Sequence, residues 1–329
     1  MKKTIPSVII MLTLISAVFI SVYPEVATAQ ADTEKIAFIR NGDIWIMNTD
    51  GSNQTPLVGG IQNAKGKISW EPGNKRLAFS RAGMLTLKYP DGGGGSHAVY
   101  DLFHAFLDST NNFWMGFTET LGAQSPEYSA DGSMVVFSYD LQANTANAMW
   151  PDYRIGFYDT KTRVVSDLRL PRGADDVLFG SAPTLSPDKS KIAFNLSKFD
   201  SRQVKPVGIV ITSSAEITES AEDLLTRAKE LSNSSSPSWS PDGKWIAYIS
   251  TDMSNQAVLV VRPDLSEKKV IWKATGGLTL HGSPPSWSPD SKKLAFSTSN
   301  GAIYTVNLDG TDAKMISGPG SDTNPAWSR

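Results

Sequence analysis

The sequence predicts an all-β fold, a six-bladed β-propeller built from four-stranded antiparallel blades. Two observations carry this prediction. A short motif recurs in register along the chain, most clearly as SWSPDGKWIAY from Ser238 and SWSPDSKKLAF from Ser286. A further copy is divided between the two ends of the chain, so that the last segment completes the first. Repeats of about 40 to 50 residues that each contain four short strands are typical of propellers.

Three weaker copies of the motif begin at Ser69, Glu127 and Thr184, and a sixth joins residues 325–328 to residues 35–38. A propeller has to close its ring, and a blade shared by both chain ends achieves this closure. An open solenoid would instead need polar capping repeats at its two ends. We therefore expect the C-terminal segment to pair beside the first strand.

Each copy contains strand and turn signals in a fixed order. A strand that ends on an aromatic residue is followed by Ser-Pro-Asp-Gly, in which Pro presets φ, Asp caps the turn and Gly accepts positive φ. An apolar second strand, an alternating third strand and a weaker fourth strand follow, with an Asp-Gly reversal such as Asp50-Gly51 before the fourth. Residues 220–231 add one amphipathic helix with Ser220 as its N-cap. The repeat tryptophans are predicted to pack between blades: Trp70, Trp239, Trp287 and Trp327.

The first 29 residues have the pattern of a secretory signal peptide. Lys2 and Lys3 precede an apolar run over residues 8–22, and the small residues of 27–29 form a cleavage site. The run is short for a bilayer-spanning helix. We therefore expect export to the periplasm or the cell exterior, with residues 30–329 forming a single propeller domain.

The composition excludes several classes of protein. The chain has 31 Lys and Arg against 33 Asp and Glu, without a block of like charge, so a nucleic-acid groove is not expected. It has no cysteine, which excludes disulfides, thiolate metal sites and a Cys nucleophile. No apolar run after the leader is long enough to cross a membrane. We expect a monomer.

At the level of the repeat, the pattern P-x-W-S-P-D-G-x-x-I-A-[FY] resembles that of the TolB-type six-bladed propellers, which also occurs in the propeller domains of prolyl oligopeptidases and dipeptidyl peptidases. The resemblance extends over residues 35–329. It implies the fold, export and a binding role in the cell envelope. TolB itself belongs to the Tol-Pal system and carries an α/β domain before its propeller, and this chain is expected to lack that domain because few residues precede the first repeat.

The expected binding surface lies on one face of the ring. Loops after the second and fourth strands of each blade emerge on this side, which we call the insertion face because the longest connections fall there. Two of these connections, residues 103–124 and 140–152, are rich in aromatic residues, which either pack beneath the loop or form a recognition patch for an envelope protein, a peptide or a small molecule. The candidate binding residues are Phe103, His104, Phe106, Phe113, Trp114, Phe117, Trp150 and Tyr153.

An alternative function is a divalent-metal-dependent propeller hydrolase or lactonase that acts on a small molecule at the central channel. Five blades carry an acidic or amide residue after the second strand, and oxygen ligands of this kind suit Ca²⁺, although turn chemistry also explains them. These residues are Asn41, Asp140, Asp200, Asp252 and Asn300. The chain contains no G-x-S-x-G or H-E-x-x-H motif, so no catalytic residue is assigned. A non-catalytic binding module is the favoured interpretation.

Overall fold

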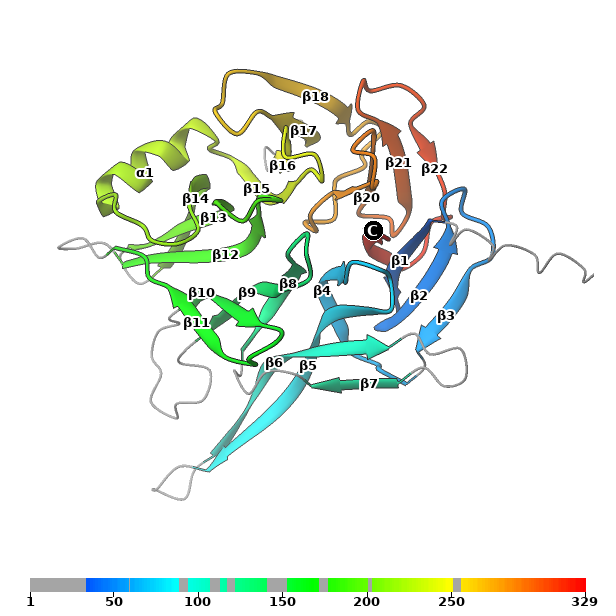
Figure 1. Ribbon diagram of the computed structural model, residues 1–329. Helices are drawn as coiled ribbons and strands as arrows, with labels where there is room; N and C mark the ends of the chain where they lie inside the picture. Colours follow the sequence, from blue (N-terminus) through cyan, green and yellow to red (C-terminus); the bar gives the residue numbers. More distant parts are fainter. Residues whose placement is uncertain are drawn as a thin grey trace, which may run out of the picture. The chain divides into compact units, whose positions relative to one another are not determined.

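Six antiparallel sheets are arranged as blades around a common centre (Figure 1). The structure is a computed structural model, and it describes residues 34–58, 60–88, 94–106, 113–116, 122–140, 153–171, 177–200, 203–250 and 256–329. The predicted six-bladed propeller is confirmed. The predicted signal peptide lies outside the described residues. Within the described residues, no helix is long and apolar enough to cross a membrane.

Five of the blades have four strands. From the centre outward, blade 1 contains β23 (Asp322–Trp327), β1 (Lys35–Arg40), β2 (Asp43–Asn48) and β3 (Thr55–Val58), and blade 2 contains β4 (Ala64–Trp70), β5 (Arg76–Lys88), β6 (Gly94–Phe106) and β7 (Phe113–Gly116). Blade 3 contains β8 (Gln124–Tyr128), β9 (Met134–Asp140), β10 (Tyr153–Asp159) and β11 (Val165–Leu168). Blade 5 contains β15 (Ser234–Trp239), β16 (Ile246–Ser250), β17 (Ala257–Val261) and β18 (Lys268–Lys273), and blade 6 contains β19 (Ser286–Trp287), β20 (Lys293–Ser297), β21 (Ile303–Asn307) and β22 (Lys314–Met315).

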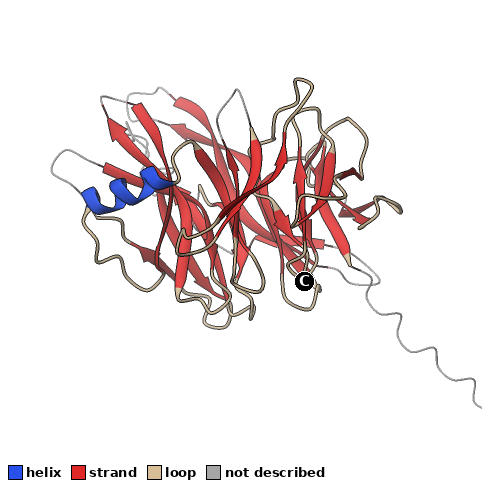
Figure 2. Ribbon diagram, turned by 90° about the horizontal axis from the view of Figure 1, so that it is seen from above, coloured by secondary structure: helices blue, strands red, loops and turns tan. Residues whose placement is uncertain are grey.

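Blade 4 differs from the prediction of four strands. It contains three strands, β12 (Val177–Leu185), β13 (Lys191–Asp200) and β14 (Gln203–Ser213), and the helix α1 (Ala221–Glu230) packs at its outer edge (Figure 2). The helix begins as predicted, because Ser220 and Asp223 form a capping box. Its buried residues Leu224 and Ala228 join the core of this blade. A helix thus occupies part of the place of a fourth strand.

Ring closure follows the predicted pairing of the chain ends. In blade 1, β23 pairs antiparallel with β1, with Ala326 opposite Ala37 and Asp322 opposite Arg40. The Arg40 guanidinium donates to both carboxylate oxygens of Asp322 at 2.6 Å and to Gln54 Oε1 at 2.7 Å. The Asp322 side chain is only 3% exposed, so this bidentate pair joins the two ends of the chain inside the blade.

The inner strands of neighbouring blades are joined by a repeated hydrogen bond. Among the described residues, four of the six blade contacts have this bond, in which the backbone N–H at the repeat aromatic or leucine position donates to the side chain that precedes this position in the previous blade. Tyr128 donates in this way to Ser69 Oγ at 2.9 Å, and Trp327 donates to Ser286 Oγ at 2.8 Å. Ser69 and Ser286, which directly precede the aromatic positions of their own blades, therefore lie at contacts between two blades.

The repeat tryptophans add a second kind of bond at the same contacts. The indole N–H of Trp70 donates to the Ala326 carbonyl, and that of Trp287 to the Ser238 carbonyl, both at 2.9 Å. All four repeat tryptophans are at most 8% exposed. All four indole rings therefore contribute buried apolar area, and those of Trp70 and Trp287 add a directed bond to the neighbouring blade.

Replacing Asp322 with Asn should destabilise the ring, because the partly buried Arg40 guanidinium then faces an amide in place of a carboxylate. We expect a loss of about 2 to 3 kcal/mol in the free energy of unfolding, measured by urea denaturation. The matched control is Glu267→Gln, which breaks exposed pairs with Arg262 at 3.2 Å and Lys269 at 2.9 Å and should cost far less, because water screens exposed charges. Equal losses for both variants would contradict a special role for the closing pair.

Candidate functional site

A polar cavity of about 510 Å³ opens at the centre of the insertion face. We call it the funnel. Every blade contributes to its wall, mostly through the first half of the inner strand. One residue from each of blades 1 to 6 illustrates this: Asn324, Gly66, Ser125, Ala182, Ser236 and Ser283. The funnel is therefore a product of ring closure, and no single repeat contains it.

The funnel wall is built from strained backbone. Five inner strands carry one residue in the left-handed region, with φ between 48° and 71°. These residues are Gly66, Ser125, Ala182, Ser236 and Asn324, and all five line the funnel. At the same places the pairing with the second strand shifts register, as in a β-bulge. Four of the five are not glycine, and such strain costs about 1 to 3 kcal/mol per residue and is concentrated at functional sites.

A proline follows each of the four non-glycine residues, as in Ser236-Pro237 and Asn324-Pro325. Proline has no N–H to donate, and it is tolerated here because the inner strand has no strand on its central side. The bulge divides each inner strand into two halves with different roles. The half before it faces the funnel, and the half after it makes the bonds between blades.

The floor of the funnel is closed by a buried ion pair. The Lys67 ammonium contacts Glu127 Oε2, and both side chains are at most 10% exposed. Glu127 Oε1 accepts from Thr184 Oγ1 at 2.9 Å, and Thr184 Oγ1 accepts from the Trp239 N–H at 3.0 Å. The network thus runs through blades 2, 3, 4 and 5. Lys67 is the only Lys, Arg, Asp or Glu among the described funnel residues, so the rest of the wall offers hydroxyl, amide and aromatic groups.

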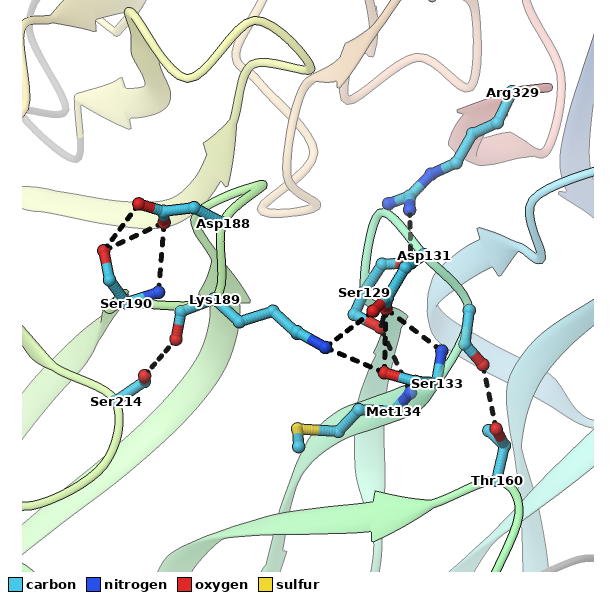
Figure 3. Close-up of polar contacts among 11 residues, drawn as sticks. Ser129, Asp131, Ser133, Met134, Thr160, Asp188, Lys189, Ser190, Ser214 and Arg329 are labelled. Atoms are coloured by element: carbon cyan, nitrogen blue, oxygen red, sulfur yellow. Dashed lines mark hydrogen bonds and ion pairs between the residues drawn. The ribbon is translucent and has the colours of Figure 1, made fainter.

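The opposite side of the ring, which we call the turn face, carries the reversals between first and second strands. In blade 3, Asp131 accepts bonds from Ser129 and Ser133 (Figure 3). Lys189 from the equivalent turn of blade 4 donates to Asp131 at 2.6 Å. In that turn, Ser186 and Ser190 bond to Asp188 and lower the pKa of its carboxyl to about 2. The aspartates of the repeat motif therefore stabilise the turns between the first and second strands by accepting hydrogen bonds within them.

The predicted aromatic loop after residue 103 is wrong in its placement. Phe103, His104 and Phe106 lie in β6, the third strand of blade 2, and Phe113 and Trp114 lie in β7, its fourth strand. The apolar run is long because β5 and β6 each have 13 residues, and its last four residues pair with strands on both sides. Phe117 and Trp150 lie outside the described residues. A binding role for these residues stays a prediction.

The structure shows the side-chain surroundings of two of the predicted binding residues, Tyr153 and His104. Tyr153 begins β10 and lines the funnel, where its ring stands edge-on to Phe179 at 6.1 Å. His104 is 5% exposed and lies between blades 2 and 3, where its Nε2 shares a 2.6 Å hydrogen bond with the Tyr128 hydroxyl. Only Tyr153 of the two can reach a ligand in the funnel.

The predicted calcium ligands are not brought together in the described part of the chain. Asn41 and Asn300 are exposed in turns, Asp140 and Asp200 end the strands β9 and β13, and Asp252 lies outside the described residues. Asn300 Oδ1 accepts from Thr298 Oγ1 at 2.7 Å, as expected for turn chemistry. Among the described residues, no three His, Asp or Glu side chains form a cluster that would suit a metal ion. Calcium binding stays a prediction.

The comparisons with known proteins agree with the six-bladed propeller fold. Residues 220–329 match the family model of the TolB beta propeller domain. Residues 220–329 therefore resemble the TolB propeller domain, and the chain as a whole has the fold of a six-bladed propeller. TolB from Acinetobacter baumannii shares the fold with a TM-score of 0.59 and 18% identity, over 90% of this chain and 66% of that one. A protein described as TolB from Agrobacterium tumefaciens gives a TM-score of 0.51 and 14% identity, over 89% of this chain and 92% of that one. No curated protein sequence matches the chain.

The resemblance to TolB-type propellers was predicted from the repeat, but the funnel residues were not. Lys67 and Glu127 lie three and one residues before the repeat aromatic positions Trp70 and Tyr128. The signal was present in the sequence, because positions shortly before the aromatic residue vary while the aromatic residue and the following turn recur. In this propeller the varying positions Lys67 and Glu127 lie at the axial cavities.

The stability of the protein should depend on His104 between pH 6.5 and 5. Burial, with a smaller contribution from the Arg76 charge, lowers the pKa of His104 to about 3. The unfolded chain takes up a proton near pH 6.5 while the folded chain does not, so stability is complete above pH 6.5 and falls as the pH decreases. The expected loss is about 2 kcal/mol by pH 5.

Urea denaturation at pH 7 and pH 5 measures this effect, with His104→Gln as the comparison. Glutamine does not titrate and can still bond to the Tyr128 hydroxyl. The pH-dependent loss should be smaller in this variant, and what remains includes His281, whose pKa is also lowered by burial. The same loss in both proteins would show that His104 does not stay neutral in the folded state.

Proposed function

We propose that this chain is an exported, non-catalytic TolB-like binding module of the cell envelope, and that it recognises a protein or peptide at the funnel. The observation that carries the proposal is the ring of five left-handed residues on the funnel wall. Bulges that strain the same position in five blades cost stability, which the bonds of Ser125 to Ser80 and of Ser236 to Asn195 and Gly282 offset in part. Their effect is to turn backbone and side-chain polar groups toward one central cavity.

The chemistry of the funnel supports binding of a polypeptide segment. Hydroxyl and amide groups, such as those of Ser181 and Gln124, can bond to peptide groups, and Tyr153 and Val204 add apolar surface at the rim. Val204 is 43% exposed. A surface that combines a few apolar anchors with neutral polar groups is typical of transient protein recognition.

The test of the binding site is to fill the funnel. Ser181 lies on its wall, and its side chain has no hydrogen bond to any of the described residues. Ser181→Trp should reduce capture of envelope proteins by more than tenfold, measured by quantitative mass spectrometry of material bound to the immobilised mature chain. Ser166→Trp is the matched control, because Ser166 is exposed on the outer strand β11. Proteins lost with Ser181→Trp and retained with the control are the partners; equal retention by both variants argues against the funnel.

The export part of the proposal has its own measurement. Expression of the full chain in a bacterium with an outer membrane, followed by N-terminal sequencing of the periplasmic protein, should give a sequence that begins at Gln30 or Asp32. A membrane-bound product that retains Met1 would contradict cleavage of the leader.

A further inference from the structure

A second, smaller cavity of about 70 Å³ lies beyond the Lys67–Glu127 pair, toward the turn face. We call it the axial pocket. The ends of the inner strands surround it, and the repeat tryptophans form much of its wall. Lys67 lines both this pocket and the funnel, so the ion pair separates the two.

The charges at the axial pocket do not balance. The side chains that line it include two cations, Lys67 and Arg329, and one carboxylate, Glu127. Arg329 crosses from blade 1 toward blade 3, where its guanidinium donates to the Tyr128 carbonyl at 2.9 Å and to the Ser129 carbonyl at 3.2 Å. Figure 3 shows the contact with Ser129. These partners are neutral. The lining side chains therefore carry a surplus of one positive charge, and the Arg329 carboxylate accepts from the exposed Asn74 side chain, which does not line the pocket.

Hydroxyl groups around the pocket have protons to donate. Ser69 Oγ and Ser286 Oγ each accept a backbone N–H from the next blade, which leaves the hydroxyl proton for another acceptor. No acceptor for either proton, and no partner for the Ser238 hydroxyl, is found among the described residues. Thr184 occupies the equivalent position in blade 4, and its hydroxyl donates to Glu127, which shows that this position can donate toward the axis.

We propose that the axial pocket binds one small anion, a halide or a tetrahedral oxyanion. Two cations and a set of hydroxyl donors are the groups that bind such ions, and charge-assisted bonds of this kind are the strong ones. A volume of about 70 Å³ holds a few water molecules or one small anion and is too small for a sugar acid or a nucleotide. The ion balances the surplus charge and contacts residues from several blades at once.

The experiment is a thermal melt of the full mature protein at constant ionic strength, with sodium gluconate replaced stepwise by sodium chloride or sodium phosphate. Gluconate is too large for the pocket and keeps screening unchanged. The melting temperature should rise with chloride or phosphate along a saturable curve, because an ion that binds only the folded state stabilises it. The same melting temperature in all three salts would overturn the proposal.

Variants separate the pocket from general salt effects. Arg329→Gln should weaken the apparent affinity for the anion at least tenfold, and Ser238→Ala should weaken it less. Glu127→Gln removes the repelling carboxylate and should strengthen it at least threefold. Lys244→Met is the control, because Lys244 is exposed and pairs with Asp242 outside the pocket.

The direction of the changes decides the outcome. Opposite effects of Arg329→Gln and Glu127→Gln, with none from the control, support the site. If Lys244→Met changes the response as much as Arg329→Gln does, the anions act on the surface and the proposal is wrong. If Arg329→Gln does not fold, an unchanged or weaker affinity in Glu127→Gln would overturn the proposal by itself.

Discussion

The hydrogen bond that crosses from one inner strand to the next sets the geometry of this propeller. The N–H of Trp239 reaches the Thr184 hydroxyl of the preceding blade, and that of Trp327 reaches Ser286 in the same way. Each bond consumes a polar side chain directly before the repeat aromatic position, so it fixes how far each inner strand extends toward the turn face. The first half of the same strand is then free to form the funnel. At the contacts where it forms, this bond adds a fixed register to apolar faces that otherwise only pack.

Much of the fold was readable from the sequence because its signals are local and repeated. The turn aspartates, the capping box at Ser220 and the split repeat all depend on neighbouring residues or on one pairing of chain ends. The third strand of blade 2 was misread because residues 103–106 lack the polar alternation of an exposed strand; they pair on both sides and pack against other aromatic rings. The funnel and the Lys67–Glu127 pair were not predicted, because they join residues 60 positions apart whose proximity exists only after closure.

Groups that do not improve the stability of the fold are concentrated near the axis of the ring. Left-handed residues before proline, a buried ion pair and an unbalanced guanidinium all lie within the inner strands, whereas the outer parts of the blades contain ordinary apolar cores. Replacing a buried ion pair by apolar residues is often neutral or stabilising in proteins, so its presence at the centre indicates a demand other than stability. Lys67 links the two cavities, because any ligand that draws its ammonium group away from Glu127 alters both of them.

The rim of the ring has a consequence for how molecules of this protein meet one another. Every blade ends in a sheet edge, and an exposed edge is a template for strand addition by another chain. Here the outermost strands β3, β7, β11 and β22 have four residues or fewer, β18 carries three lysines, and in blade 4 the helix α1 covers part of β14. Short, charged or covered edges resist such pairing. The circumference is therefore protected against edge-to-edge aggregation, a useful property for a β-rich chain at high concentration.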